Sequence, residues 1–129
     1  MALYLDSSAA VKLIVREAES EALGTWLRPH DVLASSALLR TELLRAVRRG
    51  APSRIAAVRA ALAAFTLRAV DDEILHAAGE IDPSSARSLD AIHLATALRM
   101  ATELDAIVTY DRRMIEGARA LGLPVASPA

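Results

Sequence analysis

Cysteine is absent from the 129 residues, which excludes a disulfide framework, a thiolate zinc site, an iron–sulfur cluster and a cysteine nucleophile. Aromatic residues make up only 3% of the chain, so Leu, Val, Ile and Ala must build the core. No G-x-G-x-x-G or G-K-[ST] loop occurs, so no nucleotide cofactor is expected. Neither sign of charge dominates, since 15 Lys and Arg face 16 Asp and Glu. That balance excludes a histone-like polybasic binder and an acidic disordered tail.

Long apolar runs are also missing. The longest, residues 60–65, is far shorter than the roughly 20 residues of a membrane span. The first apolar run stops at Asp6, so the N-terminus does not resemble a secretory signal. We therefore expect a soluble, cytoplasmic protein with no membrane association. Its length fits one domain, residues 1–129.

Short apolar runs typical of buried strands alternate with amphipathic stretches typical of helices. The predicted strands are 2–5, 32–34, 65–70, 106–109 and 123–126. The predicted helices are 8–16, 20–27, 36–49, 52–64, 72–80, 89–103 and 111–121. This alternation predicts an α/β fold, with a central parallel sheet of four or five strands and helices on both faces.

Four acidic residues stand where ordinary surface charge is not expected. Asp6 directly follows the first strand, and Asp111 stands two residues after the fourth. Asp90 falls in the first turn of a predicted helix, and Glu42 shares the apolar stripe of another. In an open α/β sheet the carboxyl ends of strands and the amino ends of helices meet at the edge where ligands bind. We therefore expect the four carboxylates to converge on that edge.

Four carboxylates in one pocket repel one another unless a cation neutralises them. An all-oxygen cluster without cysteine suits Mg²⁺ or Mn²⁺, and such a site can stabilise the charge that develops on a phosphodiester. The structural alternative is that Asp90 and Asp111 only cap helices or favour helix dipoles, and that Asp6 is a turn residue. Glu42 is harder to explain in that way, because an unpartnered Glu on an apolar stripe is costly. His93, in the same helix as Asp90, is expected to be a hydrogen-bonded core residue.

Four segments carry a family resemblance: YLDSSAAVKL, SALLRTELLRA, RSLDAIHLATAL and AIVTYDRRM. In this order and spacing they resemble the acidic motifs of PIN-domain ribonucleases, and most closely the VapC toxins of type II toxin–antitoxin modules. The resemblance implies a PIN-like fold and an endoribonuclease that uses Mg²⁺ or Mn²⁺ and leaves 5′-phosphate and 3′-hydroxyl ends. It also implies neutralisation by a cognate VapB-type antitoxin.

The resemblance assigns the catalytic and metal-binding acids to Asp6, Glu42, Asp90 and Asp111. It places small hydroxyl residues, expected to hold carboxylates by hydrogen bonds, at Ser7 and Thr109. Beside this set, Arg112 and Arg113 are candidate contacts for a phosphate, and Tyr110 is a candidate for stacking on a base.

Other surfaces suggest partners. Residues 11–27 offer more apolar surface than two short helices need, so we expect a groove for an antitoxin helix there, core packing being the alternative. A homodimer is expected as well. Six arginines lie within residues 40–59, as either a phosphate-binding strip or a solvated face.

A non-catalytic PIN-like module that binds RNA or protein is the competing function. Retention of all four acids argues against it, because a docking module has no reason to keep repelling carboxylates. A phosphate-accepting receiver or an aspartyl phosphatase ranks last, because the only lysine is Lys12 and no DxD follows the first strand.

Overall fold

The computed structural model describes residues 1–129, and its centre is one sheet of five parallel strands. The strands are β1 (Ala2–Leu5), β2 (Val32–Ser36), β3 (Phe65–Arg68), β4 (Leu104–Val108) and β5 (Val125–Ala126). Their order in the sheet is β3-β2-β1-β4-β5, and every neighbouring pair is parallel. The predicted parallel α/β sheet is confirmed, and β1 is its central strand.

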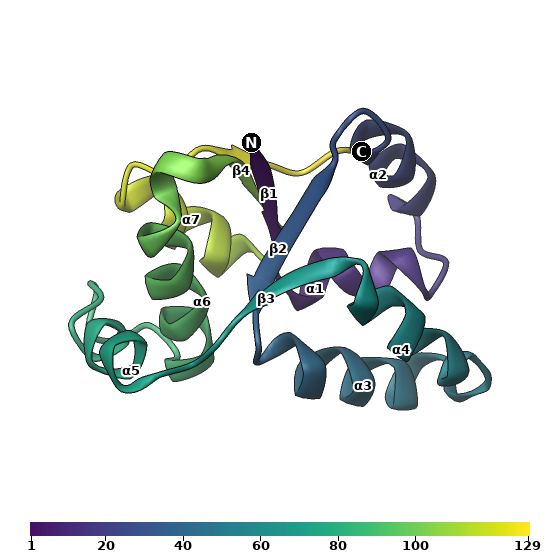
Figure 1. Cartoon of the computed structure of the whole chain (residues 1–129), viewed down its shortest axis with the longest axis horizontal. Coiled ribbons are helices and arrows are strands. Elements are labelled where there is room, and N and C mark those ends of the chain that lie inside the picture. The colour runs from purple at the N-terminus through teal and green to yellow at the C-terminus, as the bar shows by residue number, and fades with distance from the viewer.

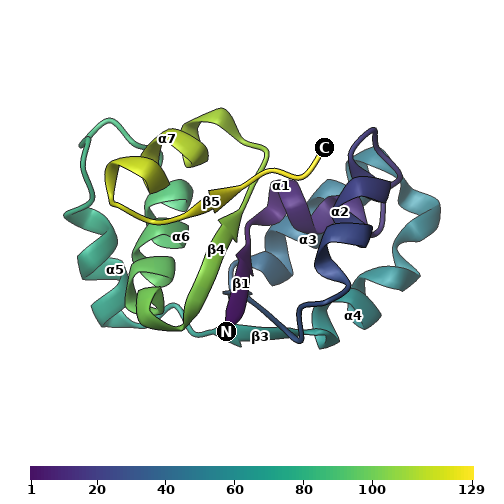
Figure 2. The ribbon, with the colours of Figure 1, turned by 90° about the horizontal axis from the view of Figure 1, so that it is seen from above.

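Seven α-helices cover the sheet. They are α1 (Ser7–Ala10), α2 (Ser20–Leu27), α3 (Leu39–Gly50), α4 (Ala56–Ala63), α5 (Asp72–Gly79), α6 (Ser88–Arg99) and α7 (Arg112–Ala120). Helices α1 to α4 lie on one face of the sheet, and α5, α6 and α7 lie on the other (Figures 1 and 2). None of the seven combines the length and the apolar character that spanning a membrane would need.

The strand alternation of β1 divides the core into two clusters. Leu3 and Leu5 pack into the cluster of α1 to α4, while Ala2 and Tyr4 pack into the cluster of α5, α6 and α7. Successive side chains of a strand point to opposite faces, so a central strand with both faces covered must be apolar throughout. All four residues are buried, which explains why β1 forms a continuous apolar run in the sequence.

The edge that carries the site is fixed by hydrogen bonds to the backbone around the end of β1. The Ser35 hydroxyl donates to the Leu5 carbonyl at 2.6 Å, and the Asp6 amide donates to the Val108 carbonyl at 3.4 Å. These bonds tie β1 to β2 on one side and to β4 on the other. The residue that follows β1 is therefore held in place from both sides.

The prediction of an apolar groove on residues 11–27 is largely wrong. Ile14, Leu23 and Leu27 are core residues of the cluster under α1 to α4, so most of this apolar surface is already used. Leu13, 37% exposed, remains accessible. Core packing, the alternative interpretation, accounts for the pattern.

Candidate active site

All four predicted carboxylates lie at the amino ends of helices along the carboxyl edge of the sheet. Asp6 is the N-cap of α1 and Asp111 the N-cap of α7, while Glu42 and Asp90 stand in the first turns of α3 and α6. Carboxylates are favourable at helix amino ends because the unpaired N–H groups and the helix dipole attract negative charge. We call these four residues the acidic edge.

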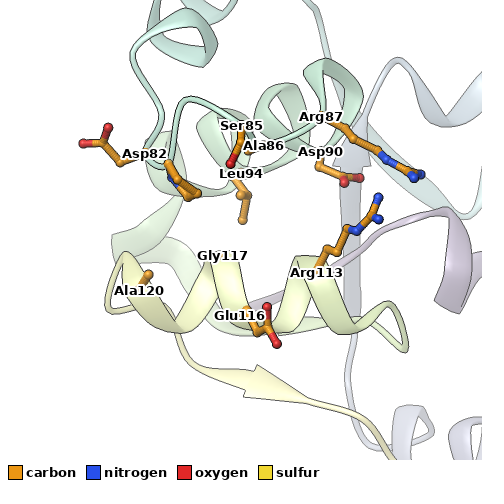
Figure 3. Close-up of a pocket in the computed structure, with 11 residues that line it drawn as sticks. Asp82, Ser85, Ala86, Arg87, Asp90, Leu94, Arg113, Glu116, Gly117 and Ala120 are labelled. Carbon is orange, nitrogen blue, oxygen red and sulfur yellow. The ribbon is translucent and has the colours of Figure 1, made fainter.

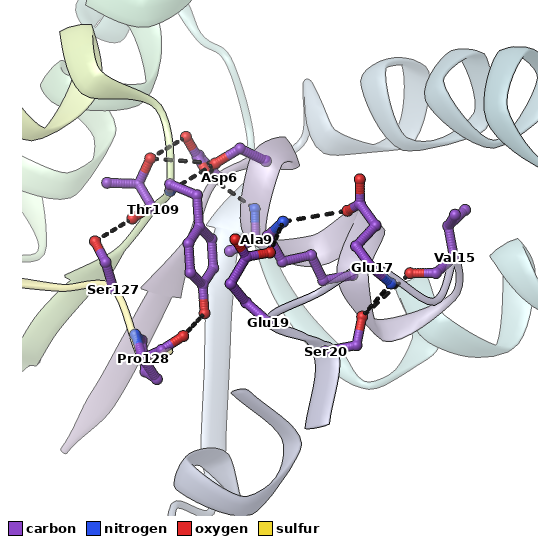
Figure 4. A network of polar contacts seen from close by, with 12 residues as sticks. Asp6, Ala9, Val15, Glu17, Glu19, Ser20, Thr109, Ser127 and Pro128 are labelled. Atoms are coloured by element: carbon purple, nitrogen blue, oxygen red, sulfur yellow. Dashed lines mark hydrogen bonds and ion pairs between the residues drawn. The ribbon is translucent and has the colours of Figure 1, made fainter. Parts of the chain in front are cut away.

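Asp6 is buried, with 4% of its surface exposed, and both of its carboxylate oxygens are hydrogen-bonded (Figure 4). Oδ1 accepts from the Ser8 hydroxyl at 2.6 Å and from the Ala9 amide at 3.1 Å, and Oδ2 accepts from the Thr109 hydroxyl at 2.6 Å. Burial raises the pKa of Asp6, and the hydroxyl donors and the charge of His93 oppose that rise. The carboxylate is therefore firmly oriented, yet its charge is not fully compensated.

Thr109 connects Asp6 with Asp111. Its side chain, fully buried, donates to Asp6 and accepts the Asp111 amide at 3.1 Å. Asp111 itself accepts from the amides of Arg113, at 2.8 Å, and Met114, at 3.4 Å. One hydroxyl thus fixes the spacing of the two strand-end acids, and the predicted contact of Thr109 with a carboxylate is present.

Glu42 is held by a buried histidine. His93 Nε2 lies 2.5 Å from Glu42 Oε1, and His93 Nδ1 lies 2.7 Å from the Tyr4 hydroxyl. Tyr4 is fully buried and His93 is 2% exposed, whereas the Glu42 side chain is 19% exposed. The inward orientation predicted for Glu42 is present, and so is the hydrogen-bonded core histidine. That the two are partners was not apparent from the sequence pattern.

The environment of Asp90 shows that the acids influence one another. Burial raises the pKa of Asp90, and the negative charges of Asp111 and Glu42 raise it further. The positive charges of His93 and Arg87 act in the opposite direction. Repulsion of this kind among carboxylates is relieved by a bound cation.

The donor set fits a hard divalent cation in its chemistry, since it consists of carboxylate oxygens with hydroxyl groups bonded to them. In the present side-chain positions no group of three Asp, Glu, His or Cys residues is close enough together to hold a metal ion. Both carboxylate oxygens of Asp6 already accept hydrogen bonds, Oδ1 from Ser8 and Oδ2 from Thr109. The acidic edge thus carries oxygen ligands, while Asp6 and Asp111 accept hydrogen bonds from hydroxyl and amide groups and Glu42 bonds to His93.

One predicted hydroxyl contact of Asp6 is made by a different residue. The predicted residue was Ser7, but no hydrogen bond of the Ser7 hydroxyl occurs, and the neighbouring Ser8 makes the contact. The reason is the cap geometry: the side chain of an N-cap residue reaches the second and third residues of its helix, which here are Ser8 and Ala9. Ser8 also accepts the Tyr110 amide at 2.9 Å.

The predicted substrate contacts, Tyr110, Arg112 and Arg113, lie in different surroundings. Lys12 lies over one face of the Tyr110 ring, 4.6 Å from its centroid, and the Tyr110 hydroxyl donates to the Pro128 carbonyl. That face is closed to a nucleobase. Arg112 is exposed but does not line the cavity beside the acidic edge, whereas Arg113 does (Figure 3).

That cavity lies between α6, α7 and the segment 82–87, and has a volume of about 670 Å³. Asp90 is part of its wall, and Arg87 and Arg113 stand on either side of Asp90 (Figure 3). No sequence pattern indicated this cavity, because its walls come from segments that meet only in the folded chain.

Known proteins resemble this chain along nearly its whole length. The PIN domain family model matches residues 3–120. Ribonuclease VapC46 of Mycobacterium tuberculosis is 48% identical over 128 residues, which cover 99% of this chain and 98% of that protein. Ribonuclease VapC47 of the same species is 40% identical over 131 residues, covering 98% and 96%.

Solved structures share the fold. The sarcin–ricin loop cleaving toxin VapC20 of Mycobacterium tuberculosis matches with a TM-score of 0.73 at 17% identity, covering 98% of this chain and 99% of that one. A toxin–antitoxin complex from Klebsiella pneumoniae matches with a TM-score of 0.71 at 18% identity, covering 100% and 98%. VapBC2 from Rickettsia felis, bound to a DNA fragment from its promoter, matches with a TM-score of 0.69 at 15% identity, covering all of both chains.

Proposed function

The chain belongs to the PIN-domain family, and from this premise we propose that it is a VapC-type endoribonuclease toxin that hydrolyses RNA with Mg²⁺ or Mn²⁺. Relatives named as VapC ribonucleases match it along nearly its whole length. The observation that carries the proposal is the acidic edge, four carboxylates at the carboxyl edge of one sheet with raised pKa values at Asp6 and Asp90.

We assign Asp6 and Asp90 as metal ligands, Glu42 as a ligand or as the group that orients the attacking water, and Asp111 as a ligand to a second metal or through water. When bound, the cation supplies Lewis-acid stabilisation of phosphate charge and lowers the pKa of a water molecule. Without it, the acidic edge repels a polyanionic substrate.

The chain's own residues contribute orientation. Ser8, Thr109 and the Ala9 amide fix both oxygens of Asp6, and His93 fixes Glu42. Hydrogen bonds that orient ligating side chains raise metal affinity and activity. These residues therefore hold the acids in position before the substrate arrives.

A non-catalytic binding module is the alternative. Burial of the Asp6 charge beside other carboxylates argues against it, because this arrangement costs stability and contributes nothing to docking. A docking protein would bind RNA or a partner without cutting RNA.

We propose a cognate antitoxin and a second copy of the chain as protein partners. A groove between α3 and α4, with a volume of about 550 Å³, offers an apolar surface lined by Leu44, Ile55, Val58 and Leu62 and flanked by Arg40 and Arg59. An amphipathic antitoxin helix with an acidic border fits its character. Two of these side chains, Leu44 (38% exposed) and Ile55 (40%), are open to solvent.

Residues 1–129 are proposed to act as one domain in the cytoplasm, where the RNA substrate is found.

Purified protein and a labelled RNA test the function. We expect cleavage with Mg²⁺ or Mn²⁺, none in EDTA, and recovery when metal is added in excess, with 5′-phosphates on the new ends. Cleavage that continues in EDTA would contradict the metal mechanism. RNA binding without cleavage under every metal condition would favour the binding module.

A further inference from the structure

The cavity beside the acidic edge is larger than metal binding alone requires. It extends about 670 Å³ along α6 and α7, from Asp90 at one end towards Ala120 at the far end of α7. A metal site needs only the few ångströms between its ligands. The remaining space is large enough for an organic group.

Two arginines flank Asp90 at one end of the cavity. Arg87, the N-cap of α6, and Arg113, in the first turn of α7, stand on either side of the Asp90 carboxylate (Figure 3). Neither guanidinium forms an ion pair with any carboxylate. Two unpaired guanidinium groups facing the same opening form a phosphate-binding arrangement, since guanidinium groups pair with phosphate oxygens through two parallel hydrogen bonds.

Deeper inside, the walls are small and partly apolar. Leu94, Ala86, Gly117 and Ala120 line this part. Gly117 is closely approached, because a Cβ at this position would lie 2.8 Å from Leu94 Cδ1. Glycine thus lets α6 and α7 approach each other there, with Leu94 packed directly against Gly117. Leu94 offers an apolar contact for the face of a nucleobase, and Ser85 and Glu116 offer hydrogen-bonding groups for its edge.

We propose that this cavity is a subsite for one nucleotide of the RNA substrate. Arg87 and Arg113 hold the phosphate adjoining the scissile bond, and the base lies against Leu94 and Gly117. The inference rests on the proposed ribonuclease function, because it places the nucleotide next to Asp90. It adds two residues that position the substrate RNA, Arg87 and Arg113. It also assigns the phosphate contact to Arg113 rather than Arg112.

The charge order favours a nucleotide over a basic protein segment. Arg87 and Arg113 repel a cationic side chain at the Asp90 end of the cavity, whereas a phosphate meets them favourably. The apolar wall then matches the base that the phosphate carries.

A nuclear magnetic resonance titration of the protein in saturating Mg²⁺ tests the subsite separately from catalysis, because a nucleoside monophosphate has no internucleotide bond to cut. The probes are the four nucleoside 5′-monophosphates and, in parallel, inorganic phosphate. We expect nucleotides to shift the amides of residues 85–94 and 113–120, and phosphate alone to bind more weakly. Arg87→Gln and Arg113→Gln should each weaken nucleotide binding about fivefold. Arg119→Gln, on the same helix but outside the cavity, should bind like the wild type.

Shifts located elsewhere, no binding, or equal binding of phosphate and nucleotides would overturn the proposal. A cleavage assay supplies the second measurement. We expect Arg87→Gln and Arg113→Gln to raise KM for a short RNA about fivefold with little change in kcat, because they position the substrate. A fall in kcat at unchanged KM would overturn the subsite. A wild type that binds nucleotides here but never cuts RNA would refute the ribonuclease function and leave the binding site intact.

Discussion

Asp6 combines two properties that ordinary capping residues do not share. It caps α1, as the dipole argument allows, but it is also 4% exposed and follows the central strand of the sheet. A capping carboxylate on the surface keeps its water, whereas this one has exchanged water for two hydroxyl groups and one amide. Its position therefore costs stability in the protein without metal, which is typical of a functional residue.

That cost predicts how stability depends on pH. The pKa of Asp6 is raised by folding, so between the unfolded and folded pKa values the folded state binds more protons, and stability falls as the pH rises. Asp6→Asn has no carboxyl group to ionise at this position, so its stability does not fall over this pH range. In EDTA at pH 7 we expect its free energy of unfolding to exceed that of the wild type by about 1 kcal/mol. The difference should vanish once the pH falls below the pKa that Asp6 has in the unfolded chain.

Urea unfolding across a pH series measures this difference. Asp105→Asn, an exposed acid in β4, is the matched control and should show no gain. An Asp6→Asn protein that is less stable than the wild type at pH 7 would mean that the buried anion is stabilising.

The contacts of His93 predict how its substitution changes stability and RNA cleavage. In His93→Ala, the Glu42 carboxylate and the buried Tyr4 hydroxyl each lose a partner. The loss of both bonds should lower stability by about 2 kcal/mol and reduce RNA cleavage, because Glu42 is no longer oriented. His93→Gln keeps a donor and should recover part of both losses. Exposed His76, on α5, is the control: His76→Ala should stay within about 0.5 kcal/mol of the wild type. Wild-type cleavage by His93→Ala would show that Glu42 needs no support.

Elements differ in how well the sequence predicts them. The ranges of β1 and α2 match the prediction at both ends, because apolar spacing and flanking polar residues agree there. The helix predicted over 36–49 begins only at Leu39, because Ser36 still pairs with Arg68 in the sheet. The helix predicted over 8–16 ends at Ala10 and continues as a 3₁₀ turn, Val11–Leu13. Apolar periodicity over so few residues does not distinguish the two helix types.

Replacing either of two glycines, one inside a helix and one just after a helix, is expected to change stability, in opposite directions. Gly24 lies inside α2, and apart from the neighbouring residues and backbone of that helix no heavy atom lies within 4 Å of the position that a Cβ would take there. Gly24→Ala should therefore stabilise the protein by about 0.5–1 kcal/mol through helix propensity. Gly122 follows α7 with a φ of +77°. Gly122→Ala should destabilise the protein by about 1–2 kcal/mol, because a side chain is strained in that conformation. Urea unfolding of both variants checks the pair, and the same sign for both would contradict the backbone argument.

At the scale of the whole molecule, the order β3-β2-β1-β4-β5 brings distant residues together. Asp6 and Thr109 are 103 positions apart, and Glu42 and His93 are 51 apart, yet each pair is hydrogen-bonded. The sequence predicted that the acids share an edge, because strand ends and helix starts meet there in any parallel α/β sheet. It could not predict the partners of the acids or the cavity along α6 and α7, since both depend on how helices from different segments pack. Choosing Ser8 over Ser7 likewise required the capping geometry of α1.

Cation binding and RNA cleavage at the acidic edge are tested most directly by the cleavage rate of Asp6→Asn with saturating Mg²⁺ or Mn²⁺. This change removes one charge at nearly constant shape, so we expect a folded protein that still binds the proposed antitoxin but loses cleavage by about a hundredfold or more. Asp111→Asn should lose less, because an amide oxygen can still reach a water bound to the metal. Asp6→Asn cutting RNA at the wild-type rate would contradict the proposed role of the acidic edge.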